Sequence, residues 1–357
     1  MKEQFLNKLI FQDRIHASLL LAGMGDALGA PTEQWTIEEI FKKYGGLVLD
    51  FDIPPEDTFA GANAGKRGEV TDDASQMYYL ARAMIAADGA LDQAGWVACL
   101  LDWASNSPKA SFMGPSTAGI VKALQEGSDT ALVGVIGTSR RKMTSVGTTN
   151  GAAMRVAPAG LIYPGNPDAA CRQALITCLP SHDTNVAISA ACSVAAAVSQ
   201  ALVSNNLHDV INGAIEGAHI GEQLASEHAR MVAGPQYIAR LEMALSIAAE
   251  ATNDYSFLTR MERMVGNSVL AAESVPAALG VVAYAKGDAL RTIALSASIG
   301  NDTDSIATMA GSIVGALVGT EKLPQNLVQE FKQANKADFD LDKLALALAA
   351  IAGRNHG

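Results

Sequence analysis

The sequence predicts an all-α protein, and three observations carry that prediction. Alanine dominates the apolar residues while aromatic residues make up only 5% of the chain, and alanine favours helices over strands. Apolar residues recur at helical spacing along most of the chain. No strand–helix alternation appears, and no linker is long or polar enough to divide the chain. We therefore expect one compact domain over residues 1–357, with about a dozen helices packed at varied angles.

The first predicted element is a long helix. Residues 2 to 28 begin as an amphipathic segment and become apolar on all sides, which predicts a buried helix that Pro31 ends. Residues 36 to 44 predict a short helix. Residues 47 to 52 are the best candidate for a strand, although no partner strand is evident. Residues 53 to 70 contain prolines, glycines and polar side chains and are expected to form a loop.

Helical spacing resumes after Thr71. Apolar residues follow the i, i+3, i+4, i+7 rule at Met77, Leu80, Ala81, Met84 and Ile85. The same spacing predicts further helices at roughly 91–104, 116–126, 168–179, 184–203, 207–228, 236–250, 257–264, 275–286, 288–299, 304–318 and 324–334. The segments between them carry glycine, proline, asparagine and serine, which are typical of loops.

Composition bounds the class of protein. Hydrophobic residues make up 49% of the chain and charged residues 18%, so the chain can bury a sizeable core. The formal net charge of −11 argues against nucleic acid or an anionic membrane as the main partner. The four cysteines, Cys99, Cys171, Cys178 and Cys192, are scattered and form no disulfide framework, which predicts a reducing, cytoplasmic setting. Nothing in the sequence indicates an oligomeric state.

Two apolar segments resemble targeting or membrane elements. The run Ser18–Met24 follows basic residues as in a signal peptide, but Asp13 and Asp26 bracket it, so we reject that interpretation. The segment Val186–Val203 is long and apolar but consists mostly of alanine and serine, which are too weakly hydrophobic for a membrane span. We expect a buried helix there.

Two predicted helices begin with clustered acidic and hydroxyl residues. One helix begins with Thr71-Asp72-Asp73, and the other begins with Asp302-Thr303-Asp304-Ser305. A threonine N-cap with aspartates in the first turn would explain either one alone. The surroundings favour another explanation, because glycines recur every fourth residue at Gly311, Gly315 and Gly319 and at Gly25 and Gly29. Glycine costs a helix roughly 1 kcal/mol per residue, so such spacing predicts a close backbone approach.

Carboxylates at the ends of closely packed central helices need a cation, because bare charges do not stay buried. Oxygen ligands of this kind suit Mg²⁺ or Mn²⁺ better than zinc. The two acidic segments therefore predict a metal site rather than simple helix capping.

Further motifs accompany the acidic segments. They are Gly25-Asp26-Ala27-Leu28-Gly29 with Glu33 after it, Asn150-Gly151-Ala152-Ala153-Met154-Arg155-Val156-Ala157-Pro158-Ala159-Gly160, Ser181-His182-Asp183 and Glu273-Ser274-Val275-Pro276-Ala277-Ala278-Leu279. With these motifs in order, the chain resembles the ADP-ribosylglycohydrolases, which are all-helical enzymes with two Mg²⁺ or Mn²⁺ ions. The resemblance covers most of the chain. It implies a metal-dependent hydrolase of an N-glycosidic (ADP-)ribosyl bond, with an ADP-ribosylated substrate or a ribosyl small molecule as partner.

The resemblance also implies roles for individual residues. The metal ligands would be Thr71, Asp72, Asp73, Asp302, Asp304 and Ser305, and Asp304 would take part in catalysis. Glu33 would act as acid/base or gate on a mobile loop, and Asp26 would orient a metal-bound water or neighbouring ligands. The residues Asn150, Gly151, Met154 and Arg155 would line the ribose and phosphate side of the pocket, and His182 would contact substrate or metal-bound water.

The chain departs from the family pattern in places. Ala74 stands where many members have a hydroxyl residue, and Asn301 replaces a glycine beside the predicted metals. Both changes bear on the range of substrates more than on the fold. Lys66-Arg67 and the stretch Gly114–Thr117 look typical of a bacterial subgroup of the family.

The predicted chemistry explains the residue types. Cleavage of a ribosyl N-glycosidic bond passes through an oxocarbenium-like state that water must attack. A metal lowers the pKa of bound water and grips the ribose hydroxyls, and a carboxylate such as Glu33 moves the proton. Taken without the resemblance, Glu33 would be a solvated loop residue.

Other functions are compatible with parts of the sequence, and some fit it better than others. A nucleosidase or ribosyl-metabolite hydrolase would use the same metals and bond, and a non-enzymatic crystallin-like member would be expected to have damaged metal motifs. Gly23–Gly29 is rich in glycine as in a dinucleotide-binding motif, but Asp26 would repel a pyrophosphate and Pro31 would break the following helix. No G-x-S-x-G segment supports a serine hydrolase.

Overall fold

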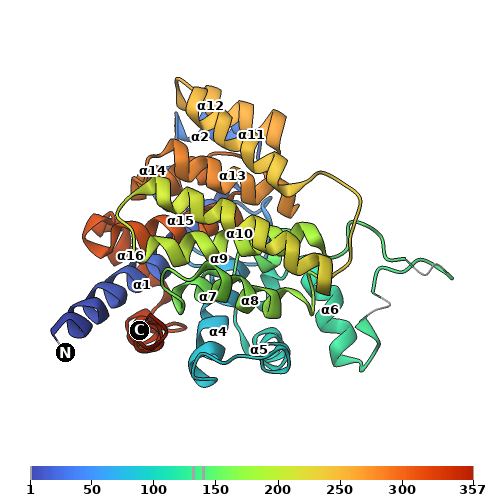
Figure 1. Cartoon of the computed structure of the whole chain (residues 1–357). Helices are drawn as coiled ribbons and strands as arrows, with labels where there is room; N and C mark the ends of the chain where they lie inside the picture. Colours follow the sequence, from blue (N-terminus) through green and yellow to red (C-terminus); the bar gives the residue numbers. More distant parts are fainter. Residues whose placement is uncertain (1, 131–132, 139–140, 357) are drawn as a thin grey trace.

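The helix that begins the chain, α1 (Lys2–Gly29), runs beside α15 (Thr303–Val318) at the centre of the molecule (Figure 1). The computed structural model describes residues 2–130, 133–138 and 141–356. The second half of α1 and nearly all of α15 are buried, because apolar side chains lie on all faces of both segments. The expected long first helix is confirmed. It ends before a 3-10 turn, η1 (Ala30–Thr32), which contains Pro31.

Glycine allows these two helices to approach closely. A Cβ atom built at Gly315 would lie 2.3 Å from the carbonyl oxygen of Ala17, and one at Gly25 would lie 2.4 Å from the carbonyl oxygen of Ala307. Gly311 and Gly29 meet backbone atoms of the opposite helix in the same way, at 2.5 Å and 2.6 Å. The predicted close approach is therefore confirmed at these positions. Gly319 differs, because it ends α15 with a φ of 75°.

The remaining helices pack around this central pair (Figure 1). In chain order they are α2 (Ile37–Tyr44), α3 (Phe59–Ala62), α4 (Asp72–Ala86), α5 (Gln93–Asn106), α6 (Pro115–Gln125), α7 (Ala157–Leu161), α8 (Pro167–Cys178), α9 (Asn185–Ala201), α10 (Leu207–His228), α11 (Tyr237–Glu250), α12 (Asp254–Arg260), α13 (Ala271–Tyr284), α14 (Ala289–Ala297), α16 (Gln325–Asn335) and α17 (Leu341–Asn355). The all-α class is confirmed. Most of the buried apolar residues form one extended core, and a small second cluster contains Ala30, Ala60 and Phe112.

Several boundaries differ from the sequence-based expectation. Residues 47 to 52 do not form a strand, and the described part of the chain contains only isolated β-bridges. Their backbone is held by side chains instead, since the amide of Val48 donates to Ser298 Oγ at 2.9 Å. The helix expected from residue 275 begins at Ala271 and passes through Pro276. The terminal helix α17 was not anticipated, although Leu344, Leu348 and Ile351 follow helical spacing and are buried.

The alanine-rich segment expected to be a buried helix is α9, which packs between α8 and α10. Its residues are almost all buried from end to end. Small side chains explain this packing, because Gly213, Gly217 and Gly221 of α10 lie against its backbone. Among the described helices, none has the length and apolar content needed to cross a bilayer.

Candidate metal centre

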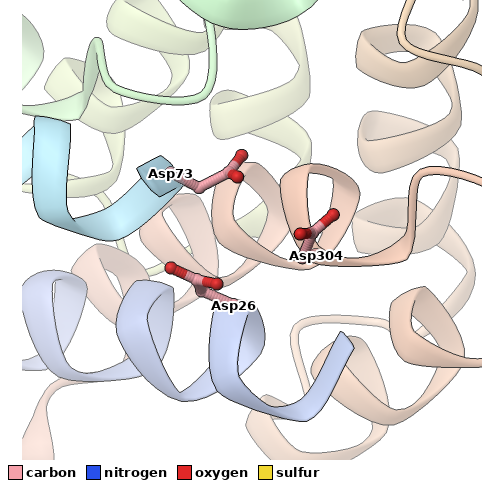
Figure 2. Close-up of side chains that lie close together, drawn as sticks. All are labelled: Asp26, Asp73 and Asp304. Carbon is pink, nitrogen blue, oxygen red and sulfur yellow. The ribbon is translucent and has the colours of Figure 1, made fainter. Parts of the chain in front are cut away.

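Three helix ends bring carboxylates together at one point. Asp26 lies near the end of α1, Asp73 in the first turn of α4 and Asp304 in the first turn of α15 (Figure 2). One carboxylate oxygen from each lies within 4.8 Å of the others, and all three side chains are buried. Residues far apart in the chain thus form one acidic cluster where α1, α4 and α15 meet.

Asp26 holds the beginning of α4 in place. Its carboxylate accepts hydrogen bonds from the Thr71 hydroxyl at 2.8 Å, the Thr71 amide at 3.0 Å and the Ala74 amide at 3.0 Å. Thr71 makes no side-chain cap, and its hydroxyl also lies 3.3 Å from Asp73 Oδ2. Simple helix capping therefore does not explain this threonine.

The beginning of α15 is held in a similar way. Asp302 makes no side-chain cap, and its Oδ2 accepts a hydrogen bond from Asn150 Nδ2 at 2.6 Å. The same amide nitrogen lies 2.8 Å from Ser274 Oγ. Asn301 adopts a φ of 58°, a left-handed conformation that asparagine tolerates better than most residues, so it can stand where the resemblance implied a glycine.

The electrostatics of the cluster are unfavourable without a cation. Burial and nearby carboxylates raise the pKa of Asp26 and of Asp302 to about 7, and burial raises that of Asp73 to about 6. Burial first and neighbouring acids second raise the pKa values of Asp72 and Asp304 well above the ordinary value. Each shift reflects the cost of a desolvated negative charge.

The donor set fits a hard divalent cation. Asp73 Oδ1 is buried and has no hydrogen-bond partner within the described residues, which is costly unless a ligand or ion completes its shell. Thr71 and Ser305 add hydroxyl oxygens beside it. Oxygen donors of this kind are what Mg²⁺ and Mn²⁺ prefer.

These residues form the floor of a cavity of about 290 Å³. Its walls contain the predicted residues Glu33, Asn150, Gly151 and Met154 together with the proposed metal ligands. Burial and the charge of Asp302 raise the pKa of Glu33 to about 8. Of the described side chains that line the cavity, five are acidic and none is lysine or arginine.

Arg155 does not line this cavity. Its guanidinium is fully buried behind the cavity, where Nη1 donates to Gln76 Oε1 at 2.8 Å and Nη2 to Ser181 Oγ at 3.0 Å. It also lies over the ring of Trp96, 4.9 Å from the centroid. Gln76 in turn donates to Asp72 Oδ2 at 3.0 Å. The structure therefore does not place Arg155 on the wall of the pocket as predicted. Its guanidinium is buried among these protein groups, and its Nε has no hydrogen-bond partner among the described residues.

His182 also lies behind the wall. Its ring is fully buried, with Nδ1 2.8 Å from Ser181 Oγ and Nε2 3.0 Å from Thr149 Oγ1. Burial and the charge of Arg155 hold its pKa well below the ordinary value. Gly151 leaves room for the ring, because a Cβ there would lie 2.8 Å from Nε2. Thr149 and Gly151 line the cavity beside the ring, whereas His182 itself does not.

Sequence reasoning missed several wall residues, namely Gln34, Phe59, Phe112, Thr149 and Val269. Thr149 directly precedes a predicted motif, which was a usable signal. Phe59 and Val269 come from segments whose position depends on tertiary packing. Residues Gly114 to Thr117, noted in the sequence without a role, form part of the wall at the beginning of α6.

Comparison with known proteins gives consistent matches. A family model described as ADP-ribosylglycohydrolase matches residues 7–356. The chain is 30% identical over 339 residues to the uncharacterized protein YegU of Escherichia coli (strain K12), covering 94% of this chain and 96% of that protein. It is 31% identical over 207 residues to ADP-ribosylhydrolase ARH3 of Homo sapiens, covering 53% of this chain and 55% of that protein.

Two further matches are a relative that aligns with part of the chain and a solved structure that aligns with nearly all of it. Over 155 residues, the chain is 32% identical to ADP-ribosyl-(dinitrogen reductase) glycohydrolase of Rhodospirillum rubrum, covering 43% of this chain and 46% of that protein. A solved structure, named as an ADP-ribosylglycohydrolase-related protein complex, superimposes with a TM-score of 0.61 at 22% identity over 96% of this chain and 99% of that one. This likeness concerns the fold alone.

Proposed function

The chain belongs to the ADP-ribosylglycohydrolase family, and from this we propose that it hydrolyses the N-glycosidic bond of an ADP-ribosylated substrate in a divalent-metal-dependent reaction. One observation carries the metal dependence. Five acidic side chains line one cavity without a lysine or arginine among its described residues, and one buried carboxylate oxygen of Asp73 has no partner. An anionic substrate can approach such a floor only if cations neutralise it.

Two Mg²⁺ or Mn²⁺ ions would be held by oxygen ligands from the two acidic helix beginnings. The proposed ligands are Thr71, Asp72, Asp73, Asp302, Asp304 and Ser305, all of which line the cavity. Asp26 would position them from α1 through its bonds to the beginning of α4. When bound, the ions would supply positive charge that activates water and orients sugar hydroxyls.

Glu33 is the group best placed to move a proton. It lines the cavity, and its pKa of about 8 keeps its carboxyl mostly protonated near neutral pH. As a base it would take a proton from the attacking water, and as an acid it would give one to the departing nitrogen. Nearby bound cations would lower its pKa and favour the ionised form.

The beginning of α6 is the element best suited to receive a diphosphate. Gly114, Pro115, Ser116 and Thr117 line the cavity there, and the positive end of a helix dipole favours anions. Phe59 and Phe112 offer aromatic rings in the same wall, against which a base can stack. This part of the wall takes the role that the sequence had suggested for Arg155.

A nucleosidase or ribosyl-metabolite hydrolase is the second candidate, and one observation favours it. Arg155, the cation expected to meet a diphosphate, is buried and does not line the cavity. A nucleoside would need no such cation. A non-enzymatic, crystallin-like role is disfavoured, because Asp73, Asp302 and Asp304 are all present and lie together.

The setting and partners follow from charge and cysteine content. We propose a cytoplasmic protein, since the cysteines are free and three of the four are buried. The net charge of −11 and the acidic cavity disfavour nucleic acid as partner.

A substrate panel tests the proposed function. The protein is stripped with EDTA and assayed with and without Mg²⁺ or Mn²⁺ on ADP-ribosyl-arginine peptide, ADP-ribosyl-serine peptide and several nucleosides. Metal-dependent release of ADP-ribose would support the proposal. Metal-dependent release of a free base would support the second candidate, and activity that survives complete metal removal would contradict both.

A further inference from the structure

A chain of buried hydrogen bonds connects Arg155 to the cavity wall. Arg155 Nη2 lies 3.0 Å from Ser181 Oγ, which lies 2.8 Å from His182 Nδ1. His182 Nε2 lies 3.0 Å from Thr149 Oγ1, and Thr149 lines the cavity. Arg155, Ser181 and His182 are at most 3% exposed, so the chain is shielded from solvent.

The chemistry of arginine fixes the direction of these bonds. A guanidinium can only donate, so Ser181 Oγ accepts from Arg155. The single Ser181 hydrogen is then available for His182 Nδ1. The opposite arrangement, with a proton on Nδ1, would leave the buried Ser181 hydroxyl hydrogen without an acceptor. His182 is neutral because burial and Arg155 hold its pKa low, so its one ring proton lies on Nε2 and is donated to Thr149.

Thr149 is left with a hydrogen to donate. Its oxygen accepts from His182, and the hydroxyl makes no hydrogen bond to any other protein group in the described chain. Backbone bonds hold the residue on both sides, because the Asn150 amide donates to Val269 and the Ala271 amide donates to Thr148, at 2.8 Å and 2.9 Å. These bonds hold Thr149 in place, so its hydroxyl donates from a fixed position in the cavity wall.

Several polar side chains of the cavity wall cannot donate a hydrogen bond to a ligand. Ionised carboxylates only accept, and the side-chain amide of Asn150 already donates to Ser274 and Asp302. A hydroxyl whose hydrogen must point into the cavity selects ligands that present an oxygen acceptor there. A ligand that presents an N–H or O–H group at the same place would meet a second hydrogen.

We propose that Thr149 is a specificity-determining residue that donates its hydroxyl hydrogen to an acceptor oxygen of the substrate, such as a phosphoryl or ribose oxygen. Arg155, Ser181 and His182 are positioning residues that impose this direction without touching the substrate. The proposal rests on the proposed function, because it takes the cavity as the substrate site.

Binding of ADP-ribose to the Mg²⁺-saturated protein tests the donation, with calorimetry as the readout. We expect Thr149→Val, which removes the hydroxyl at nearly constant size, to weaken binding about tenfold. Thr149→Ser keeps the hydroxyl and should bind within about twofold of the wild type. The matched control is Thr148→Val, because that buried neighbour does not line the cavity and should leave binding unchanged.

The positioning role is tested by coupling. Ser181→Ala should weaken ADP-ribose binding in the wild type and have little further effect in Thr149→Val, because both changes remove the same donation. A purely structural effect of Ser181→Ala would weaken both backgrounds equally and would overturn the positioning role.

Nitrogen NMR of His182 gives a readout that does not depend on the ligand. We expect a pyridine-like Nδ1 and a protonated Nε2 in the wild type and in Thr149→Val. A proton on Nδ1 would overturn the inferred direction. If the tautomer is as expected but wild type neither binds ADP-ribose nor releases it, the proposed function fails for ADP-ribose while the hydroxyl direction stands. If wild type binds ADP-ribose and Thr149→Val binds it equally well, the specificity role of Thr149 is wrong.

Discussion

The carboxylate of Asp26 accepts hydrogen bonds from both the backbone amide and the hydroxyl of Thr71, at 3.0 Å and 2.8 Å. The end of α1 therefore determines where α4 begins, and with it the position of the acidic residues that follow Thr71. An arrangement in which one carboxylate orients the backbone of other proposed ligands suits a positioning role.

Asp26→Asn should weaken metal binding without unfolding the protein. An amide has one accepting oxygen and one donating nitrogen, so it cannot accept from Thr71 and Ala74 as the carboxylate does. We expect the Kd for Mg²⁺ to rise by about 10- to 100-fold in calorimetry. Asp13→Asn is the control, because Asp13 lies on the same helix but is exposed. An unchanged Kd in Asp26→Asn would contradict the positioning role.

Asp304→Asn should abolish turnover while preserving the fold. The side chain is buried among other acids, and its pKa is well above the ordinary value because of burial and the charge of Glu33. A neutral amide of the same size removes that charge, so the metal-free variant should melt at or above the temperature of the metal-free wild type. Differential scanning calorimetry with and without Mg²⁺ checks this. Full activity would remove Asp304 from the site.

Stability of the metal-free protein should fall as the pH rises. Folding raises the pKa of Glu33 to about 8 and that of Asp302 to about 7, above the ordinary carboxyl values near 4 of the unfolded chain. The folded state therefore holds more protons. The stability that these groups contribute is greatest below about pH 4 and declines until the folded pKa of each group, about 7 for Asp302 and about 8 for Glu33. Each such group lowers the free energy of unfolding by about 1.4 kcal/mol per pH unit within that window.

Thermal unfolding in EDTA across this pH range measures the effect. Saturating Mg²⁺ should flatten the curve, since bound cations favour the ionised carboxylates. A metal-free melting temperature that rises between pH 6 and pH 8 would contradict the raised pKa values of Asp26 and Asp302.

The fold was predictable where local pattern and tertiary contact agree. The glycine spacing in α1 and α15 predicted a backbone approach that the structure confirms at Gly25 and Gly315. Residues 47 to 52 were misassigned because strand propensity needs a partner strand, and here Ser298 supplies the hydrogen bond instead. The helix expected from about residue 275 begins four residues earlier, at Ala271, and Pro276 lies inside its first two turns.

The site was predictable in its acids and less so in its walls. Asp73 and Asp304 stood in motifs whose chemistry was visible in the sequence, and the structure brings them together. The direction of a side chain is not encoded in a motif. Arg155 belongs to a predicted segment but does not line the cavity, because Gln76 and Ser181 bind its buried guanidinium.

The two hydrogen bonds of Arg155, to Gln76 and to Ser181, should have separate effects on the site. Gln76→Met keeps the size of the side chain but removes the link from Arg155 to Asp72. We expect the Kd for Mg²⁺ to rise about tenfold, because the Asp72 carboxylate loses the group that orients it. The His182 tautomer should stay unchanged, since Ser181 still connects it to Arg155.

Gln173→Met is the matched control for that change. Gln173 is also buried and donates to the carbonyl of Leu91, but it has no link to the site. Both variants should lose about 1–3 kcal/mol of stability, because each leaves a buried polar partner unsatisfied. Only Gln76→Met should weaken metal binding. An equal effect of both variants on Mg²⁺ affinity would contradict the role of the hydrogen bond from Gln76 to Asp72.

The packing of α1 against α15 should couple stability to metal affinity. In Gly25→Ala the new Cβ would lie 2.4 Å from the carbonyl oxygen of Ala307, so the helices must move apart beside Asp26. We expect a loss of about 1–3 kcal/mol in the free energy of unfolding, together with weaker Mg²⁺ binding, measured by denaturant titration and calorimetry.

Gly353→Ala is the control for Gly25→Ala, because the same substitution is expected to raise stability there. Gly353 is exposed in α17 and a Cβ there meets no atom within 4 Å, so alanine should raise stability by about 1 kcal/mol through helix propensity alone. If Gly25→Ala behaves like Gly353→Ala, the close contact between α1 and α15 does not set the position of Asp26. If Gly25→Ala loses stability but keeps full Mg²⁺ affinity, the contact stabilises the fold without shaping the metal centre.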